Sequence, residues 1–169
     1  MSASHEGQVV VVTGAGKGIG QAIALAYARE GARLALVARS INELEDTAKQ
    51  AEALGVPACV VPADVSIREH VDRMVAQVID QYATIDIMVN NAGGSSGFAP
   101  VAQLEDAAWE ECLNWCLNPV FWGSRRALQT MEQNGWGRII NYSSDASLHP
   151  PGPLVRAYAT SKVDLNQFT

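Results

Sequence analysis

The chain has 169 residues, about one domain, and 48% of them are hydrophobic, which is enough for a substantial core. The formal net charge is −6 and the Lys and Arg residues are scattered, which argues against a nucleic-acid-binding protein, because such proteins cluster positive charge on one face. The polar N-terminus has no signal-peptide pattern and no apolar run approaches the roughly 20 residues that span a bilayer, so we expect a single cytoplasmic domain over 1–169 without a membrane segment.

Strand and helix patterns alternate along the chain. Short apolar runs predict strands at 9–12, 34–37, 58–61, 85–89 and 138–142. Helical patterns cover 21–30, 40–54, 66–82, 106–133 and the segment from 156 onward. The spacings Ser40-x-x-Glu43 and Ser66-x-x-Glu69 predict a capping box at the start of two helices. A Gly/Ser-rich loop is predicted at 93–97 and a Pro-rich loop at 149–153. The alternation predicts an α/β fold with a doubly wound parallel sheet of the Rossmann type, which binds ligands beyond the carboxyl ends of its strands.

A glycine-rich turn joins the first strand to the first helix. Its sequence, T-G-A-G-K-G-I-G, gives the glycines the spacing T-G-x-x-x-G-x-G. Glycines there let a pyrophosphate approach the N-terminus of the helix, where free N–H groups attract anions. The alternative is a glycine turn that binds no ligand. The candidate cofactor-binding residues of this turn are Thr13, Gly14, Gly16, Lys17, Gly18, Ile19 and Gly20.

The end of the second strand indicates which nicotinamide cofactor is bound. NAD-binding proteins usually carry an acid there, which bonds the ribose 2′-hydroxyl. Here the position holds Ala38, followed by Arg39, so we expect no carboxylate to repel a 2′-phosphate. Arg39 and Lys17 could pair with that phosphate instead. We therefore predict NADP(H) in preference to NAD(H), with a merely solvated Arg39 as the alternative.

Tyr158 and Lys162 lie four residues apart at the start of the last predicted helix, and therefore on one face of it. A cation beside a phenol stabilises the ionised form, which suits a tyrosine to general acid–base catalysis near neutral pH. Ser143 and Ser144 follow the fifth strand, and a hydroxyl there could hold a substrate oxygen. The alternatives are an ordinary surface Tyr and Lys, and serines that cap a turn.

The three cysteines are Cys59, Cys112 and Cys116. Their odd number gives no disulfide framework, and no companion residues for a metal site stand nearby in sequence. Cys112 and Cys116 are four residues apart on one predicted helix, so they could share a face. We predict buried structural thiols and no metal.

Together these motifs resemble the short-chain dehydrogenase/reductase family, from about residue 7 to the last residue. Besides the glycine turn and the Tyr-x-x-x-Lys pair, the resemblance rests on Asp64-Val65, on the Asn-Asn-Ala-Gly run at 90–93, and on Ser144. Each motif alone is common, whereas their order and spacing together are specific to the family.

The resemblance implies a role for each of these residues. Tyr158 would exchange a proton with the oxygen of a small carbonyl or alcohol substrate, and Ser144 would orient that oxygen. Lys162 would hold the nicotinamide ribose and favour ionisation of Tyr158, so that both residues also contact the cofactor. The remaining cofactor contacts would be Asp64 and Val65, against the adenine, and Asn91, Ala92 and Gly93. Hydride would pass between the nicotinamide and the substrate carbon, which is chemistry that the cofactor carries.

Two positions of the long predicted helix depart from the family pattern. The family usually carries a fourth catalytic residue there, an Asn, and the register places Cys116 at its position, with Asn114 and Asn118 two residues away on either side. Pro119 stands where a glycine is common, and it removes a helix hydrogen bond to the carbonyl of Trp115. The family's water relay to the lysine would then depend on the backbone carbonyl of residue 116.

The last residue is Thr169, whereas family members continue with further strands and a segment that covers the substrate. The resemblance implies the sheet order 3-2-1-4-5 without the later strands, which makes the fifth strand an exposed edge. We expect Val163, Leu165 and Phe168 to be partly exposed, the chain alone to be poorly stable and nearly inactive, and a full-length form to be a homo-oligomer. Two alternatives to an active oxidoreductase stay open: a truncated cofactor-binding fragment with little or no turnover, and a structural or interaction domain.

Overall fold

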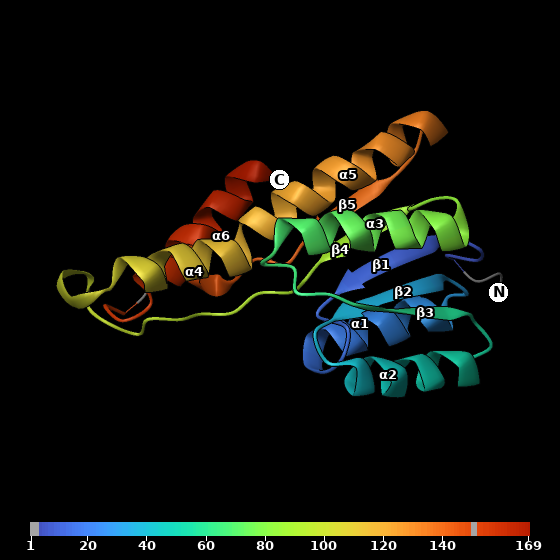
Figure 1. The fold of residues 1–169 in the computed structure, drawn as a ribbon, viewed down its shortest axis with the longest axis horizontal. Helices are drawn as coiled ribbons and strands as arrows, with labels where there is room; N and C mark the ends of the chain where they lie inside the picture. The colour runs from blue at the N-terminus through green and yellow to red at the C-terminus, as the bar shows by residue number, and fades with distance from the viewer. Residues whose placement is uncertain (1–3, 150–151) are drawn as a thin grey trace.

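The computed structural model describes residues 4–149 and 152–169, which form a sheet and the helices around it (Figure 1). The strands are β1 (Val9–Thr13), β2 (Arg33–Ala38), β3 (Ala58–Pro62), β4 (Ile87–Asn90) and β5 (Arg138–Asn141). The helices are α1 (Gly18–Arg29), α2 (Ile41–Ala53), α3 (Arg68–Tyr82), α4 (Asp106–Cys116), α5 (Asn118–Asn134) and α6 (Arg156–Phe168), with 3-10 turns η1 (Val101–Gln103) and η2 (Asp145–Ser147). The predicted Pro-rich loop includes residues 150 and 151, which lie outside the described residues.

The strands form one parallel sheet in the order β3-β2-β1-β4-β5, which confirms the predicted α/β fold and strand order. β1 lies at the centre, where Val12 stands opposite Leu36 of β2 and Val89 of β4. The strands of a parallel sheet all end at the same edge, so the segments that follow them meet there. This carboxyl edge is where such a sheet binds its ligands.

Helices cover both faces of the sheet (Figure 1). Val10 and Val12 of β1 pack with α1 and α2, whereas Val9 and Val11 pack with α3 and α5. All four valines are fully buried, and burial of a side chain of this size contributes roughly 1.5–3 kcal/mol. The run of four valines is therefore apolar on both faces because both faces are covered.

The long helix predicted over 106–133 is wrong, because the structure divides it in two. α4 ends at Cys116 and α5 begins at Asn118, with Leu117 between them at φ −110° and ψ −55°. Pro119 has no N–H with which to continue the first helix, but it is tolerated in the first turn of a new one. α4 runs beyond the end of the sheet, where it packs against α6 around Cys112, Cys116 and Ala157 (Figure 1).

Two helix starts differ from the prediction, and a third helix, α2, starts after Ser40 as predicted but with an incomplete capping box. The capping box at Ser66 is wrong: Ser66 Oγ donates to Asp64 Oδ1 at 2.7 Å, and α3 begins at Arg68. The box at Ser40 is half formed. The N–H of Glu43 donates to Ser40 Oγ at 3.4 Å, but the Glu43 carboxylate pairs with Lys17 instead of the backbone N–H of Ser40. α1 begins at Gly18 rather than residue 21, so the last glycines of the turn belong to the helix.

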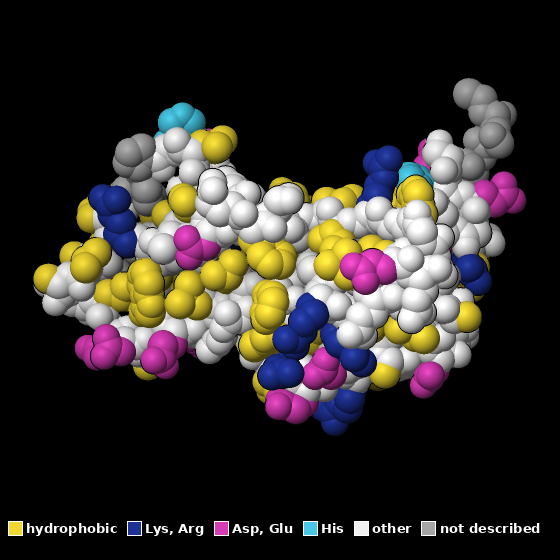
Figure 2. Space-filling view, turned by 90° about the horizontal axis from the view of Figure 1, so that it is seen from above, with side chains coloured by type: hydrophobic (Ala, Val, Ile, Leu, Met, Phe, Trp, Pro, Cys, Tyr) yellow, Lys and Arg dark blue, Asp and Glu magenta, His cyan; other side chains and the backbone are white. Residues whose placement is uncertain are grey.

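β5 forms an edge of the sheet, as predicted, and its Ile140 is 40% exposed. Seen from above, apolar side chains gather over the part of the molecule where α4, α5 and α6 lie (Figure 2). Val163 and Phe168 of α6 are each 43% exposed, as predicted, but Leu165 is buried. The prediction for Leu165 is wrong because it shares the inward face of α6 with the buried Ser161, four residues earlier. Within 4–149 and 152–169, no helix is both long and apolar enough to cross a bilayer.

Candidate active site

A pocket of about 470 Å³ opens at the carboxyl edge of the sheet. Its walls are the segments that follow four of the strands, together with Trp115 of α4. The lining residues are Gly14, Gly16 and Lys17 after β1; Ala38, Arg39, Ser40 and Glu43 after β2; Ala63, Asp64 and Val65 after β3; and Ala92, Gly93, Gly94 and Ser95 after β4. Predicted cofactor-binding residues from all four segments therefore meet in one place.

The glycine turn has the backbone that an anion site needs. Gly14 and Gly18 adopt φ angles of +70° and +59°, which residues with a Cβ rarely adopt. Lys17 caps α1 without a side-chain hydrogen bond, so the first-turn N–H groups are left for a ligand. Gly20 is required for a different reason, because a Cβ there would overlap the carbonyl oxygen of Gly14. The backbone angle therefore favours glycine at positions 14 and 18, and the close approach of Gly14 requires it at position 20.

Thr13 and Asn91 stand outside the pocket lining and hold two of its walls together. Thr13 Oγ1 accepts hydrogen bonds from the N–H groups of Asn91 and Ala92, each at 3.0 Å. The side-chain amide of Asn91 donates to the Thr13 carbonyl at 2.9 Å. Thr13 is buried, so these bonds form in a medium where hydrogen bonds are strong. Ile19, another predicted contact, also lies outside the lining and is half exposed.

Asp64 is a fixed carboxylate on the wall that follows β3. Its Oδ1 accepts hydrogen bonds from the N–H and the hydroxyl of Ser66, at 3.0 and 2.7 Å. Burial opposes ionisation, but these hydrogen bonds and the positive charges of Arg39 and His70 together lower the pKa of Asp64 below its ordinary value. An ionised acceptor beside the apolar Val65 suits this wall to a ligand that is both planar and polar at its edge.

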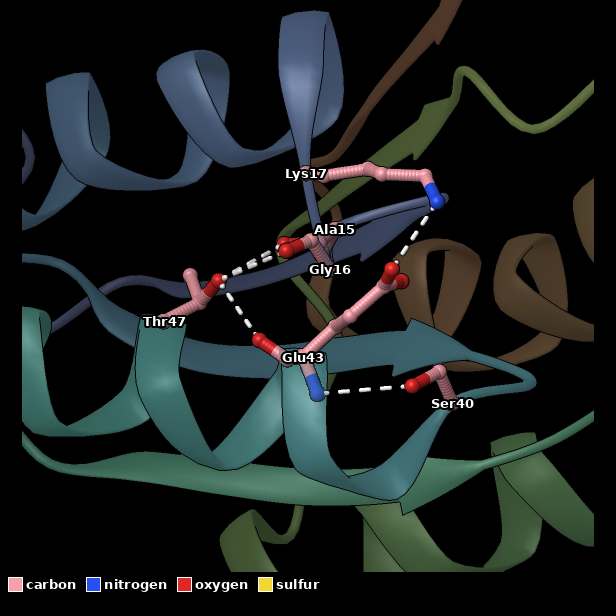
Figure 3. Close-up of polar contacts among 6 residues, drawn as sticks. All are labelled: Ala15, Gly16, Lys17, Ser40, Glu43 and Thr47. Atoms are coloured by element: carbon pink, nitrogen blue, oxygen red, sulfur yellow. Dashed lines mark hydrogen bonds and ion pairs between the residues drawn. The ribbon is translucent and has the colours of Figure 1, made fainter.

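Glu43 is the one charged residue of the pocket lining that was not predicted from the sequence. The end of β2 itself carries no acid, but α2 brings this carboxylate into the same pocket as Arg39. Glu43 Oε1 lies 2.8 Å from Nζ of Lys17, one of the two cations that the sequence assigned to that phosphate (Figure 3). The capping-box spacing held the signal, because an acid in the first turn of a helix points back toward the preceding segment.

Tyr158 and Lys162 lie on α6, beside the pocket rather than in its lining. Lys162 is 4% exposed, its Nζ donates to the Tyr142 carbonyl at 2.7 Å, and Nζ is 5.7 Å from the centre of the Tyr158 ring. Burial lowers the pKa of Lys162 from its ordinary value, and the negative charge of the thiolate forms of Cys116 and Cys112 opposes this shift. A Cβ on Gly93 would lie 3.6 Å from Lys162 Nζ. Gly93 is therefore where the pocket and the Tyr-Lys pair meet.

Ser144 precedes η2, the turn that packs against α6. Its Oγ accepts a hydrogen bond from the N–H of Ala146 at 3.2 Å, which is the capping role given above as the alternative. A hydroxyl that accepts one hydrogen bond can still donate its own hydrogen to a substrate oxygen. Ser143 Oγ donates to the Lys162 carbonyl at 3.2 Å and so ties α6 to the end of β5.

Cys112 and Cys116 form a buried pair of thiols beneath the loop that follows β4. Cys116 Sγ donates to the Gly94 carbonyl at 3.0 Å, and a Cβ on Gly93 would lie 3.6 Å from it. A hydrogen bond from Cys112 lowers the pKa of Cys116, as does the charge of Lys162, while burial opposes both. Cys59, by contrast, is only partly buried. Among the residues that the structure describes, no group of three or more His, Cys, Asp or Glu is arranged to hold a metal ion.

Replacement of Cys116 with asparagine is expected to be tolerated. Asparagine is similar in size, and its amide can keep the hydrogen bond to the Gly94 carbonyl. Asn114 and Asn118 bond to each other at 2.6 Å, so neither competes for that carbonyl. We expect the melting temperature to change by less than about 4 °C, since 1 kcal/mol corresponds to about 2–4 °C at this chain length. A fall as large as that of Cys116→Leu, measured in parallel, would show that the new amide cannot be accommodated under the loop.

The chain is similar to known proteins in both sequence and fold. A family model described as short chain dehydrogenase matches residues 8–169. The 11-beta-hydroxysteroid dehydrogenase A of Sesamum indicum is 37% identical over 166 residues, which are 96% of this chain and 46% of that protein. The L-sorbose reductase of Gluconobacter frateurii, solved with NADPH and L-sorbose, has a TM-score of 0.94 and 32% identity, over 99% of this chain and 64% of that one. An NAD+-bound xylitol dehydrogenase has a TM-score of 0.89 and 32% identity, over 98% and 68% of the two chains. The chain thus spans about half to two thirds of the length of these relatives.

Proposed function

The chain belongs to the short-chain dehydrogenase family, and from this we propose that it is an oxidoreductase that uses NADP(H) to transfer hydride to or from a small carbonyl or alcohol substrate. One observation carries the proposal: Lys162, with the Tyr158 ring next to it, approaches Gly93, and Gly93 lines the pocket that also holds Arg39 and Asp64. A dinucleotide needs such a pocket along a helix N-terminus, and the reaction needs a proton donor next to it.

The cofactor fits the residues that line the pocket. Its pyrophosphate would lie on the first-turn N–H groups of α1, where the backbone of Gly14 and Gly18 leaves room. Its adenine would lie against Asp64 and Val65, and its nicotinamide would reach Gly93. When bound, the cofactor supplies the hydride chemistry.

The chain's own residues handle the proton and the substrate oxygen. The Tyr158 hydroxyl gives a proton to the carbonyl oxygen in reduction and takes one from the alcohol in oxidation. The Lys162 ammonium favours the ionised phenol, and it has three donors, so it can hold a ribose hydroxyl while keeping its hydrogen bond to Tyr142. The Ser144 hydroxyl donates to the same substrate oxygen and fixes its position.

We expect Arg39→Ala to weaken NADPH binding about tenfold or more, because a hydrogen bond between charged groups contributes about 1.5–3 kcal/mol. NADH has no 2′-phosphate, so its affinity should change by less than about twofold by the same reasoning. Fluorescence titration with both cofactors measures this, with the exposed Arg29→Ala outside the pocket as the control. Equal weakening of both cofactors would contradict the assignment of Arg39 to the phosphate. The structural relatives include one solved with NADPH and one with NAD+, so they do not favour either cofactor. The proposed preference for NADP(H) over NAD(H) therefore rests on Arg39 and Lys17.

A second candidate function is cofactor binding with little or no turnover. The exposed edge of β5 favours it, because Ile140 of β5, and Val163 and Phe168 of α6, are each at least 40% exposed in the part of the chain that the structure describes. An open strand edge beside apolar side chains invites fraying or pairing with another chain, and a Tyr-Lys pair on such a helix would lose its geometry. NADPH binding without reduction of any member of a panel of aldehydes and ketones would favour this second function.

We further propose that the protein works in the cytoplasm as a homo-oligomer. Exposed apolar side chains on α5 and α6, among them Phe121, Leu128 and Phe168, support association, because contiguous apolar surface usually marks an interaction site. Phe121 and Phe168 are in edge-to-face contact with ring centres 6.3 Å apart, so they already form one surface. Light scattering of the purified chain tests the association, and a monomer at all concentrations would contradict it.

A further inference from the structure

Lys17, one of the two cations assigned to the cofactor 2′-phosphate, is engaged by a carboxylate. Its Nζ lies 2.8 Å from Glu43 Oε1, with the lysine side chain 80% exposed and the glutamate 37% exposed. In Figure 3 the Lys17 side chain extends from the glycine turn across to Glu43, which rises from α2 to meet it. Lys17, Glu43 and Arg39 all line the same pocket.

Glu43 is the fixed partner of this pair. Its side chain packs on the bare backbone of Gly16, where an added Cβ would lie only 2.9 Å from Glu43 Cβ. The buried Thr47 Oγ1 lies 3.1 Å from the Glu43 carbonyl and 3.1 Å from the Ala15 carbonyl, which ties α2 to the glycine turn (Figure 3). The N–H of Glu43 is bonded to Ser40 Oγ. Lys17 is the more exposed partner, so it is the one that is free to move.

The charges of the pocket do not favour a phosphate as clearly as the sequence predicts. Two cations, Lys17 and Arg39, face two carboxylates, Glu43 and Asp64, in one lining. A phosphate monoester carries about −1.5 to −2 charges at neutral pH, so it attracts Lys17 as Glu43 does. An exposed ion pair such as Lys17–Glu43 is weak, and a bound phosphate can therefore displace the glutamate at a small cost.

We propose that Glu43 is a specificity-determining residue: it competes with the cofactor 2′-phosphate for Lys17 and so limits the preference for NADP(H) over NAD(H). The inference rests on the proposed function, because it needs a dinucleotide in this pocket. It makes cofactor choice depend on α2 as well as on the end of β2. Glu43→Gln keeps the packing on Gly16 and releases Lys17.

The test uses two cofactor fragments that lack nicotinamide, 2′,5′-ADP and 5′-AMP, titrated calorimetrically into the full chain. Glu43→Gln should tighten 2′,5′-ADP binding about fivefold, the free-energy scale of an exposed ion pair, and change 5′-AMP binding less than about twofold. Asp46→Asn removes the same charge from the same helix outside the pocket and should change neither. In a Lys17→Met background, the gain from Glu43→Gln should disappear.

Each outcome is decisive. A gain for 2′,5′-ADP that requires Lys17 and is absent in Asp46→Asn supports the competition. No gain, or an equal gain with and without Lys17, overturns it while the proposed function stands, provided that wild type binds the fragments. If wild type binds neither fragment at millimolar concentration, the pocket is not a dinucleotide site, and the proposed function fails together with this inference.

Discussion

In a full-length form of the protein, replacing Tyr158 with phenylalanine is expected to reduce carbonyl reduction by about a hundred- to ten-thousandfold, the range of a lost general acid. The ring stays in place beside Lys162, and only the hydroxyl proposed to give its proton to the substrate is lost. The residues proposed to contact the pyrophosphate and the adenine belong to other segments of the chain, so NADPH affinity should change by less than about threefold, within the weight of one neutral hydrogen bond.

Two measurements on the same preparation test this prediction: NADPH oxidation with a panel of carbonyl compounds, and NADPH affinity by fluorescence. Tyr27→Phe is the matched control, because it removes a hydroxyl from α1, in a ring that packs edge-to-face on His5 and outside the pocket lining. A Tyr158→Phe chain that reduces carbonyls at the rate of Tyr27→Phe would refute the role of Tyr158.

Replacing Gly20 with alanine is expected to abolish cofactor binding and destabilise the fold by about 1–3 kcal/mol, the cost of forcing an extra methyl into a packed site. The new Cβ would overlap the Gly14 carbonyl oxygen and lie 2.6 Å from Asn91 Nδ2. The carbonyl belongs to the turn itself, and Asn91 is bonded to Thr13, so neither atom can move without opening the glycine turn, which is the proposed pyrophosphate site.

Gly55→Ala is the control for the backbone cost of losing a glycine. Gly55 has φ +89° just after α2, and an added Cβ there meets no atom within 4 Å. The variant should lose about 1–2 kcal/mol through backbone strain alone and bind NADPH as wild type does. Chemical denaturation and NADPH titration separate the two effects. Normal NADPH binding by Gly20→Ala would show that the turn does not hold the cofactor.

The sheet and the glycine turn could be predicted from the sequence because their signals are local. Four consecutive valines fit only a strand covered on both faces, and the glycines that follow fit only a turn without side chains. The division of the long helix was missed because Pro119 signals a break without saying whether the helix kinks or restarts, and the structure restarts it at Asn118.

The candidate site was predicted less completely, because its charged side chains take partners that the helix-capping motifs do not include. Ser66 has the spacing of a cap, but Asp64 takes its hydroxyl instead. Glu43 has the spacing of a capping-box acid, but Lys17, 26 residues earlier in the chain, takes its carboxylate. In both cases a partner outside the local motif offers a stronger, charged hydrogen bond than the helix terminus does.

We propose that the pocket at the carboxyl edge binds NADP(H) with its nicotinamide beside Tyr158. A crystal structure of the chain grown with saturating NADP+ tests it most directly. We predict the pyrophosphate on the N-terminus of α1, the adenine against Asp64 and Val65, and the nicotinamide at Gly93, with space for a carbonyl within about 3 Å of the Tyr158 hydroxyl. Crystals without the cofactor, or with its nicotinamide on the far side of the pocket from α6, would contradict the account.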